Sequence, residues 1–313
     1  EKLIDVLLVM VKHAEDPLRK VELLHRVGEY YERELENSVD AFKTYARALH
    51  EDAQNDTTLG HLERLAQVTT AWADLATIYE GQLGRLPEAS QKVDMLLRIA
   101  RVYEEELQKL DQAIGTHRRV LEADQENRDA TLALDRLYAQ TQQYPQLADI
   151  LKREIRQAQS DSDIVALQFR LGQLYEQNLQ DIGSAIEVYR EILNVDPGHG
   201  PTLAALEMLF AEGHKPLEIA AILEPLYRAA EQWDRLVRIH EVQLDKLTVL
   251  DDRLQMLQRI AELHEQRLDD KALAFQTFGR ALREVPANEF AGEEVERLAG
   301  ETGAWPELVE TYT

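Results

Sequence analysis

The feature that most constrains this chain is a sequence pattern that recurs four times. Four segments align without gaps, and each carries an aromatic or histidine residue at the same place: Tyr31, Tyr103, Tyr175 and His264, which are 72, 72 and 89 residues apart. The segments read LLHRVGEYYERELENSVDAF from Leu23, MLLRIARVYEEELQKLDQAI from Met95, LQFRLGQLYEQNLQDIGSAI from Leu167 and MLQRIAELHEQRLDDKALAF from Met256. Because self-similarity at a fixed period is typical of repeat architectures, the chain is predicted to consist of copies of one 72-residue unit.

A second marker shows that one copy is longer than the others. An aromatic residue followed three positions later by leucine occurs at spacings of 72, 89 and 72 residues, at Trp72, Tyr144, Trp233 and Trp305. Both markers place 17 extra residues, the difference between 89 and 72, before Trp233. The regular pattern is therefore interrupted within Leu209–Trp233.

Each copy has room for two helical hairpins. In the third copy Leu167, Leu171 and Leu174 share one helix face, and Ile186 and Tyr189 share another. Helices of this length cannot bury enough apolar surface alone, so neighbouring hairpins must stack into a solenoid. We therefore predict an all-α superhelix of antiparallel hairpins with about 17–18 helices, one of them an extra helix near 209–233.

The predicted solenoid forms a single domain over residues 1–313. The cores of its double-hairpin units lie at about 17–86, 89–160, 161–247 and 250–313. The third of these ranges includes the 17-residue insertion. With only 14 Gly and 9 Pro and no Pro-rich or Ser-rich linker, the composition favours continuous helical structure. Leu3 aligns with Leu75, and Thr313 lies inside the helix equivalent to it, so we expect a segment of a longer array.

The first hairpin of each unit resembles the tetratricopeptide repeat. The clearest copy reads Leu171-Gly172-x2-Tyr175, then Ala185-x3-Tyr189, then Pro197. The Gly or Ala lets the two helices of a hairpin approach closely, and the proline follows a helix that it cannot continue. The turn between the two helices is one residue longer than in the family pattern. The resemblance implies a solenoid similar to long bacterial tetratricopeptide arrays, although HAT-like and other α-solenoid repeats share this periodicity.

The charge of the chain excludes several classes of ligand. Lys and Arg total 35 and Asp and Glu total 58, which gives a formal net charge of −23. Recognition of nucleic-acid phosphates requires a basic surface, so no nucleic acid is expected as a partner. The chain has no cysteine, so disulfides and sulfur-ligated metal sites are excluded. No apolar run approaches the roughly 18 residues of a membrane span, so no membrane insertion is expected.

The sequence contains no catalytic signature. His240-Glu241 begins like the HExxH zinc motif, but Leu244 stands where the second histidine would be, and His264-Glu265 lacks it in the same way. Phosphate-binding glycine motifs and the G-x-S-x-G nucleophile motif do not occur. We therefore expect no enzyme activity, with no catalytic residue, no metal and no cofactor.

The resemblance implies that the first helix of each hairpin lines a concave groove that binds a partner. Two positions per copy would face this groove, and they are occupied by Glu29, Arg101, Gln173 and Glu262, and by Glu32, Glu104, Glu176 and Glu265. The second set is glutamate in every copy, which has two interpretations. The glutamates either form an acidic groove for a basic peptide or pair with arginines of the next hairpin.

The ion-pair interpretation is preferred, because three arginines stand at the corresponding place. The expected pairs are Glu32–Arg64, Glu104–Arg136 and Glu265–Arg297. Exposed pairs of this kind typically contribute under about 1 kcal/mol each. In the third copy Met208 replaces the arginine, so Glu176 is expected to be unpaired, and Met208 becomes a further candidate for partner binding.

A second candidate surface is the apolar segment Leu8, Val9 and Met10. The equivalent residues of later copies are polar or small, namely Glu80, Gly81 and Gln82, and Lys152, Arg153 and Glu154. The segment is either a patch for a partner or a second copy, or a face that packs on a preceding hairpin.

The interrupting segment itself has the pattern of a duplicated single helix with its turn. Leu209-Phe210 and Leu226-Tyr227 both align with the same dipeptide of the second copy, Leu137-Tyr138. Pro216 is expected to start a helix, and Pro225 to kink or divide that helix. We predict a three-helix unit between about Pro201 and Leu247 that bends the superhelix.

The function favoured by these patterns is a non-catalytic scaffold that binds a peptide or protein along the groove or edge of the solenoid. The net charge favours a basic partner. The alternative is a regulatory or targeting arm of a larger enzyme or multiprotein machine whose catalytic part lies outside this segment. Neither compartment nor oligomeric state follows from the sequence, although a cytoplasmic location is favoured over a periplasmic one.

Overall fold

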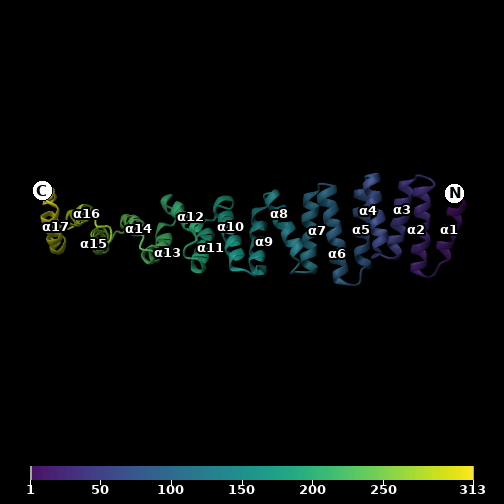
Figure 1. The fold of residues 1–313 in the computed structure, drawn as a ribbon, viewed down its shortest axis with the longest axis horizontal. Coiled ribbons are helices and arrows are strands. Elements are labelled where there is room, and N and C mark those ends of the chain that lie inside the picture. Colours follow the sequence, from purple (N-terminus) through teal and green to yellow (C-terminus); the bar gives the residue numbers. More distant parts are fainter. Residues whose placement is uncertain (1, 313) are drawn as a thin grey trace. The chain divides into compact units, whose positions relative to one another are not determined.

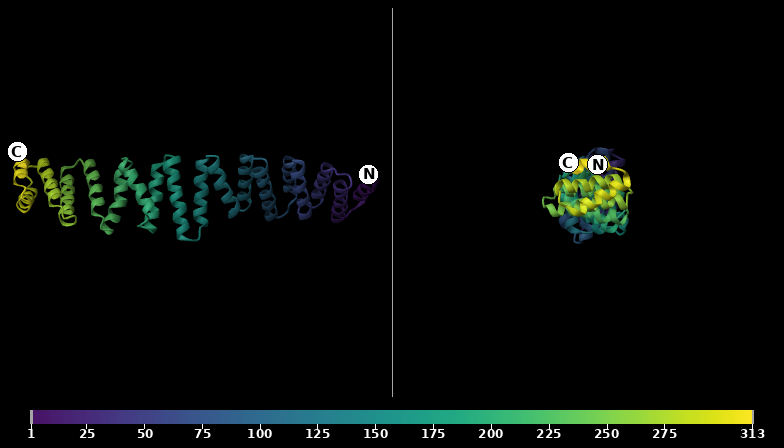
Figure 2. Two further views of the ribbon diagram at one scale, coloured as in Figure 1. Left: turned by 45° about the horizontal axis from the view of Figure 1, so that its top comes forward. Right: turned by 90° about the vertical axis from the view of Figure 1, so that its left-hand side faces the viewer.

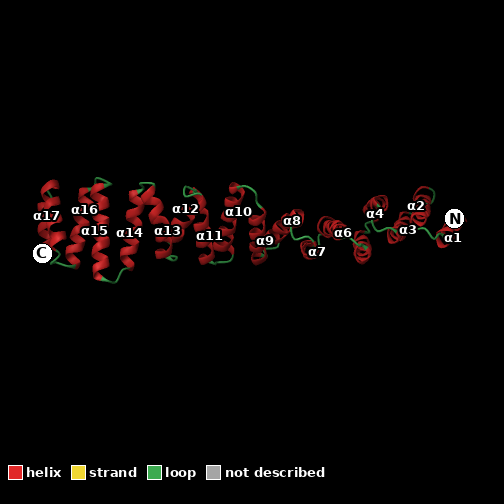
Figure 3. Ribbon diagram, turned by 90° about the horizontal axis from the view of Figure 1, so that it is seen from below, coloured by secondary structure: helices red, strands yellow, loops and turns green. Residues whose placement is uncertain are grey.

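A computed structural model of the protein describes residues 2–312, which form helices joined by short loops. Within this range there are 18 α-helices and no β-strand (Figure 3). Helices that follow one another in the sequence pack as antiparallel hairpins, which confirms the predicted all-α class (Figures 1 and 2). None of these helices is both long and apolar enough to span a bilayer.

The contacts divide the chain into two compact units, Glu1–Leu167 and Gln168–Thr313. Unit 1 contains α1 (Lys2–His13), α2 (Pro17–Arg33), α3 (Ser38–Glu51), α4 (Asp56–Thr69), α5 (Trp72–Gln82), η1 (Leu83–Arg85), α6 (Ala89–Arg101), η2 (Val102–Glu106), α7 (Leu110–Ala123), α8 (Arg128–Gln140), α9 (Tyr144–Gln157) and the start of α10 (Asp161–Gln173). The helices α2 and α6 are the first helices of the first and second copies. Short five-residue π-helical turns such as η2 extend some first helices.

Unit 2 contains the end of α10 and the remaining helices. These are η3 (Leu174–Asn178), α11 (Ile182–Val195), α12 (Gly200–Ala211), α13 (Pro216–Ala229), α14 (Trp233–Lys246), α15 (Leu250–Gln266), α16 (Lys271–Glu284), α17 (Glu289–Thr302) and α18 (Trp305–Tyr312). The aromatic markers Trp233 and Trp305 are the first residues of α14 and α18, as Trp72 and Tyr144 are of α5 and α9. The marker therefore records where the last helix of each copy begins.

The turn inside each first hairpin contains the extra residue that the sequence pattern shows. Four non-glycine residues adopt positive φ there: Glu36, Gln108, Gln180 and Asp269, with φ between 49° and 54°. The residue after each donates its backbone N–H to a carbonyl six residues earlier, as in Asn37 to Tyr31 at 2.8 Å and Lys109 to Tyr103 at 2.8 Å. The added residue thus satisfies helix-end carbonyls that would otherwise lack a partner.

The interrupting segment forms the extra helix that its sequence predicts. Pro216 occupies the first turn of α13, and Pro225 lies inside α13 without dividing it. Both α12 and α13 end in the same turn: Gly213 and Glu231 have positive φ, and the residue after each donates to a carbonyl five residues back. The duplication of one helix with its turn is thereby confirmed, while the bending of the superhelix stays a prediction.

A close contact between glycine and tyrosine determines how tightly two hairpins fold. A Cβ on Gly28 would lie 2.5 Å from Cζ of Tyr45, and one on Gly172 would lie 2.4 Å from Cε1 of Tyr189. Tyr45 and Tyr189 are both fully buried. In the other two copies alanine replaces the glycine, and the facing residue is His117 or Phe278 instead of tyrosine. The two positions therefore change together: glycine faces tyrosine, and alanine faces histidine or phenylalanine.

We predict that Gly28→Ala destabilises unit 1 by about 1–3 kcal/mol, because the new methyl group overpacks against Tyr45. Adding Tyr45→His, which reproduces the Ala100–His117 pair of the second copy, should recover part of this loss. Urea unfolding followed by circular dichroism measures both, as a double-mutant cycle.

The matched control is Gly60→Ala in α4, where a Cβ would meet no atom within 4 Å. This change should stabilise the helix by up to about 1 kcal/mol. Equal effects of Gly28→Ala and Gly60→Ala would show that the contact with Tyr45 does not limit the packing.

Candidate functional site

The glutamates predicted to face the groove form ion pairs with arginines of the next hairpin. Arg64 donates to Glu32 at 2.5 Å, linking α4 to α2. Arg136 pairs with Glu104 between α8 and η2. Arg297 of α17 pairs with Glu265 of α15 through two contacts of 2.9 Å. The three pairs expected from the sequence are thus confirmed.

Within each pair the arginine is the more exposed partner. The side chains of Glu32, Glu104 and Glu265 are 18%, 15% and 18% exposed. Those of Arg64, Arg136 and Arg297 are 50%, 59% and 39% exposed. These glutamates therefore do not form an uncompensated acidic surface.

The third copy differs, although not in the way that the sequence predicts. Glu176 was expected to be unpaired, but the hydroxyl of Tyr189 donates to its Oε2 at 2.6 Å. Burial, together with this carboxylate, raises the pKa of Tyr189. The expectation was wrong because it considered only the next hairpin, whereas the partner of Glu176 lies in the second helix of its own hairpin.

Met208 is left as an apolar side chain in a row that elsewhere carries arginine. It is 58% exposed, and Ala204 and Ala211, one turn away on either side, are exposed too. The same positions hold Gly60, Arg64 and Gln67 in α4, and Glu293, Arg297 and Gly300 in α17. The solvent-facing stripe of α12 is therefore uncharged. Sequence reasoning found Met208, whereas the exposure of Ala204 and Ala211 beside it is given by the packing of α12.

The other predicted groove residues have separate environments. Arg101 pairs with Glu105 one turn later, at 2.8 Å. Gln258 donates to Glu262 at 2.8 Å. Glu29 is exposed and Gln173 is half-buried. The structure does not bring these four residues together into one cluster.

The apolar segment of α1 divides between core and surface. Leu8 packs against the cluster formed by Ile4, Leu7 and Val11. Val9 and Met10 are exposed. Of the three residues predicted to form a patch, only these two are largely accessible to a partner.

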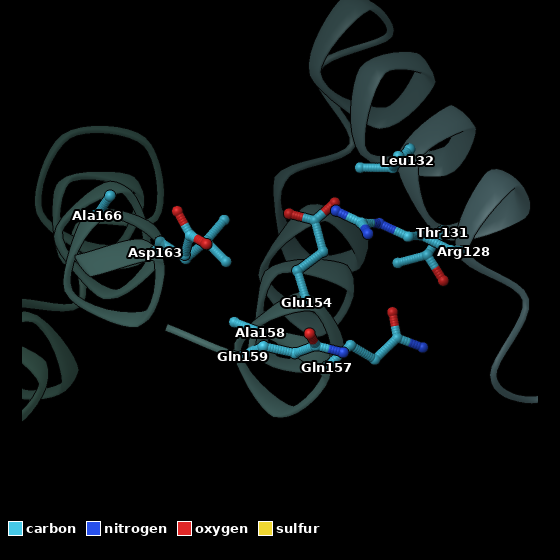
Figure 4. Close-up of a pocket in the computed structure, with 10 residues that line it drawn as sticks. Arg128, Thr131, Leu132, Glu154, Gln157, Ala158, Gln159, Asp163 and Ala166 are labelled. Carbon is cyan, nitrogen blue, oxygen red and sulfur yellow. The ribbon is translucent and has the colours of Figure 1, made fainter. Parts of the chain in front are cut away.

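A cavity of about 450 Å³ lies in unit 1 between α8, α9 and the start of α10 (Figure 4). Figure 4 shows the guanidinium group of Arg128 directed toward the carboxylate of Glu154, which is buried in α9. The equivalent residues of the first copy are Asp56 and Gln82. The cation at position 128 and the buried carboxylate at position 154 are therefore both replaced in the first copy. The cavity is lined by one cation, Arg128, and two carboxylates, Glu154 and Asp163, so it offers no cationic surplus.

Five histidines are held in environments that disfavour their charged form. Burial is the main cause of the lowered pKa of His25, His61, His117, His240 and His264. His25 of α2 accepts or donates a hydrogen bond with Thr58 at 2.7 Å, and its ring lies 5.8 Å from that of His61. Among residues 2–312 no group of three or more His, Asp or Glu side chains is arranged to hold a metal ion. The histidines therefore act as packing residues.

Two segments of the chain match models of the tetratricopeptide repeat, residues 96–131 and 165–199. Each segment begins within the first helix of a hairpin and continues through the widened turn and the second helix. Residues 165–199 end in the loop that follows, and residues 96–131 end in the first turn of α8. No curated protein matches the sequence.

Several solved structures are similar to this chain. YrrB, a tetratricopeptide-repeat protein with an unusual peptide-binding site, is 15% identical, with 62% of this chain and 93% of that chain covered, at a TM-score of 0.34. A tetratricopeptide-repeat protein from Parabacteroides merdae is 13% identical, with coverages of 89% and 98% and a TM-score of 0.34. The C-terminal part of a repeat protein from Cytophaga hutchinsonii is 13% identical, with coverages of 87% and 99% and a TM-score of 0.35.

Acid should destabilise unit 1 as the pH falls below about 6.5, the ordinary histidine pKa. In the folded state His117 has a lowered pKa and stays neutral, whereas the unfolded chain binds the proton, so the stability present at higher pH is lost. Glu104 raises this pKa and Arg136 lowers it, but burial dominates.

Replacing His117 by phenylalanine, the residue that the fourth copy has at this position, should reduce the pH dependence. Urea midpoints at about pH 7.5 and about pH 5.5 measure the effect for wild type and variant. An unchanged difference between the two midpoints would mean that His117 does not contribute to it.

Proposed function

Because the chain is a tetratricopeptide-repeat protein, we propose that it is a non-catalytic scaffold that binds a segment of a partner protein on the first helices of its hairpins. Tetratricopeptide domains generally mediate protein–protein interactions. Solenoids of this kind present extended surfaces whose exposed residues can change without altering the packing beneath them. The question is then which part of the surface is free to engage a partner.

The observation that carries the proposal is the uncharged stripe of α12. In the other copies the position equivalent to Met208 is an arginine that already binds a glutamate of its own copy. At Met208 this internal pairing is missing, and the side chain is 58% exposed. An exposed methionine is flexible and polarisable, and such side chains adapt to partner surfaces of different shape.

We assign the centre of the binding surface to Met208. We place Gln173 and Glu176 beside it, because in the other copies the glutamate equivalent to Glu176 contacts the arginine that Met208 replaces. An apolar side chain of the partner would pack on Met208, which follows the usual pattern of an apolar anchor with polar surroundings. The net charge of −23 favours basic residues flanking that anchor. Glu32, Glu104 and Glu265 instead link consecutive hairpins of their own copies through their ion pairs.

The experiment starts with selection of ligands from a random-peptide library on the wild-type protein. The affinity of an enriched peptide is then measured for wild type and for Met208→Arg, which introduces the residue that the three other copies carry. The variant should fold normally and bind at least about tenfold more weakly, because charge replaces the apolar contact.

The matched control is Arg136→Met, the reverse change at the equivalent position of the second copy. It should leave binding of the selected peptide within about twofold of wild type, since most surface contacts are energetically near neutral. Equal affinity of the wild-type and Met208→Arg proteins would contradict the assignment of the site. Failure of any peptide to be enriched over the bare matrix would count against the proposed function itself.

A further inference from the structure

Unit 1 contains a second and larger cavity, on a different side of α9 from the one in Figure 4. It measures about 680 Å³ and lies between α7, α8 and α9. Its inner wall includes Leu134, Tyr138 and Ile150. Four basic side chains line it: Arg118, Lys152, Arg153 and Arg156.

The charge of this cavity opposes that of the protein as a whole. Its lining holds four cationic side chains against two carboxylates, those of Glu122 and Asp149. The chain as a whole carries a net charge of −23. A local cationic surplus of this kind does not follow from the average composition.

Comparison with the other copies shows that the surplus is confined to this place. Arg153 and Arg156 of α9 correspond to Gly81 and Gly84 in the first copy, and to Val242 and Asp245 in α14. Repetition of the fold therefore does not require cations there. Arg118 of α7 corresponds to Ala46 in the first copy and Gly279 in the fourth, whereas the third copy keeps an arginine there, Arg190. Through α7 and α9, Arg118, Arg153 and Arg156 meet at one cavity.

A role in stabilising the fold accounts for one of these arginines. Nη1 of Arg153 donates to the backbone carbonyl of Gln125 at 2.5 Å, just beyond the end of α7. Arg118 and Arg156 form no ion pair or hydrogen bond within residues 2–312. These two guanidinium groups are therefore available to a ligand.

Arg118, one of the two available arginines, shares the cavity with the aromatic side chain of Tyr138. Burial raises the pKa of the Tyr138 hydroxyl, and among the charges close enough to act on it are Arg118, which lowers it, and Asp149, which raises it. The cavity thus combines a guanidinium group, a phenol and apolar side chains. Such a combination suits a ligand that carries both negative charge and apolar groups.

We propose that this cavity binds an acidic segment of a partner protein, with carboxylate side chains on Arg118 and Arg156 and an apolar side chain against Tyr138. The planar guanidinium fork binds a carboxylate through two parallel hydrogen bonds, which a small number of arginines can provide. Nucleic acid is the less suitable ligand, because binding of its phosphates requires an extended basic surface, and the chain carries a net charge of −23. The surface is separate from the α12 stripe, so either can fail without the other.

The test uses a short fluorescein-labelled peptide in which Asp and Glu alternate with Leu. Its counterpart, in which Asn and Gln replace the acids, tests the need for charge. Fluorescence anisotropy at about 150 mM salt limits long-range repulsion, because the screening length there is about 8 Å. The wild-type protein should bind the acidic peptide at least about tenfold more tightly than the amide peptide.

The decisive variant is Arg118→Gln/Arg156→Gln, and the matched control is Arg19→Gln/Arg190→Gln. Both remove two positive charges, but Arg19 and Arg190 pair with glutamates of their own helices and do not line the cavity. The first variant should weaken binding of the acidic peptide at least about tenfold, and the control less than about twofold. Circular dichroism shows whether both variants fold as wild type does.

Three results would overturn the proposal. These are equal affinity for the acidic and amide peptides, equal weakening by the two double variants, and tighter binding of a labelled single-stranded oligonucleotide that depends on Arg118 and Arg156. The last result would assign the cavity to nucleic acid instead of a protein segment. None of them bears on the peptide selected for the surface around Met208, so the two proposals are tested independently.

Discussion

Within each unit, burial of apolar side chains between consecutive helices stabilises the fold, since none of these helices could be stable alone. The most demanding contact in this packing lies between Gly28 and Tyr45, and again between Gly172 and Tyr189, where the ring occupies the place of a methyl group. Because each helix packs mainly against its sequence neighbours, a change in one copy is contained within that copy. The chain can therefore accommodate an added helix, α13, while the helices on both sides keep their hairpin packing.

The charged residues on the surface also interact mainly within their own copy. Repeat-equivalent charged residues first satisfy one another: Glu32–Arg64, Glu104–Arg136 and Glu265–Arg297 link the first helices of successive hairpins. Exposed pairs of this kind add little to stability, but they leave few groups in the row that are free to bind a partner. The positions that depart from the repeat are then the informative ones. Met208 in α12 and the arginines of α7 and α9 are two such departures, and they differ in chemical character.

The periodic features could be predicted from the sequence because each depends on residues at fixed spacing. The helical hairpins, the added helix before Trp233 and the three ion pairs all follow from comparing copies at equivalent positions. The contact between Tyr189 and Glu176 could not be predicted in this way, because it depends on the direction of a side chain across its own hairpin. The positive φ of Glu36 and Gln108 had no local signal either, since neither residue is glycine or asparagine.

The candidate sites were less predictable than the fold for a related reason. The cavity between α7 and α9 combines residues of two helices that are not adjacent in sequence, so the pattern within one helix does not predict it. The exposure of Ala204 and Ala211 beside Met208 became evident only once the packing of α12 was known. Comparison among copies shows where the chain departs from its own repeat, whereas the structure shows whether the departing side chain faces solvent.

The most direct test of a partner site on α12 is the rate at which hydrogen peroxide oxidises each methionine, with and without a selected peptide. Met208 and Met10 are both exposed, in different units, whereas Met95 is buried and reacts slowly. Bound peptide should slow oxidation of Met208 and leave that of Met10 unchanged. An unchanged rate at Met208 under saturating peptide would contradict the assignment of this surface to partner binding.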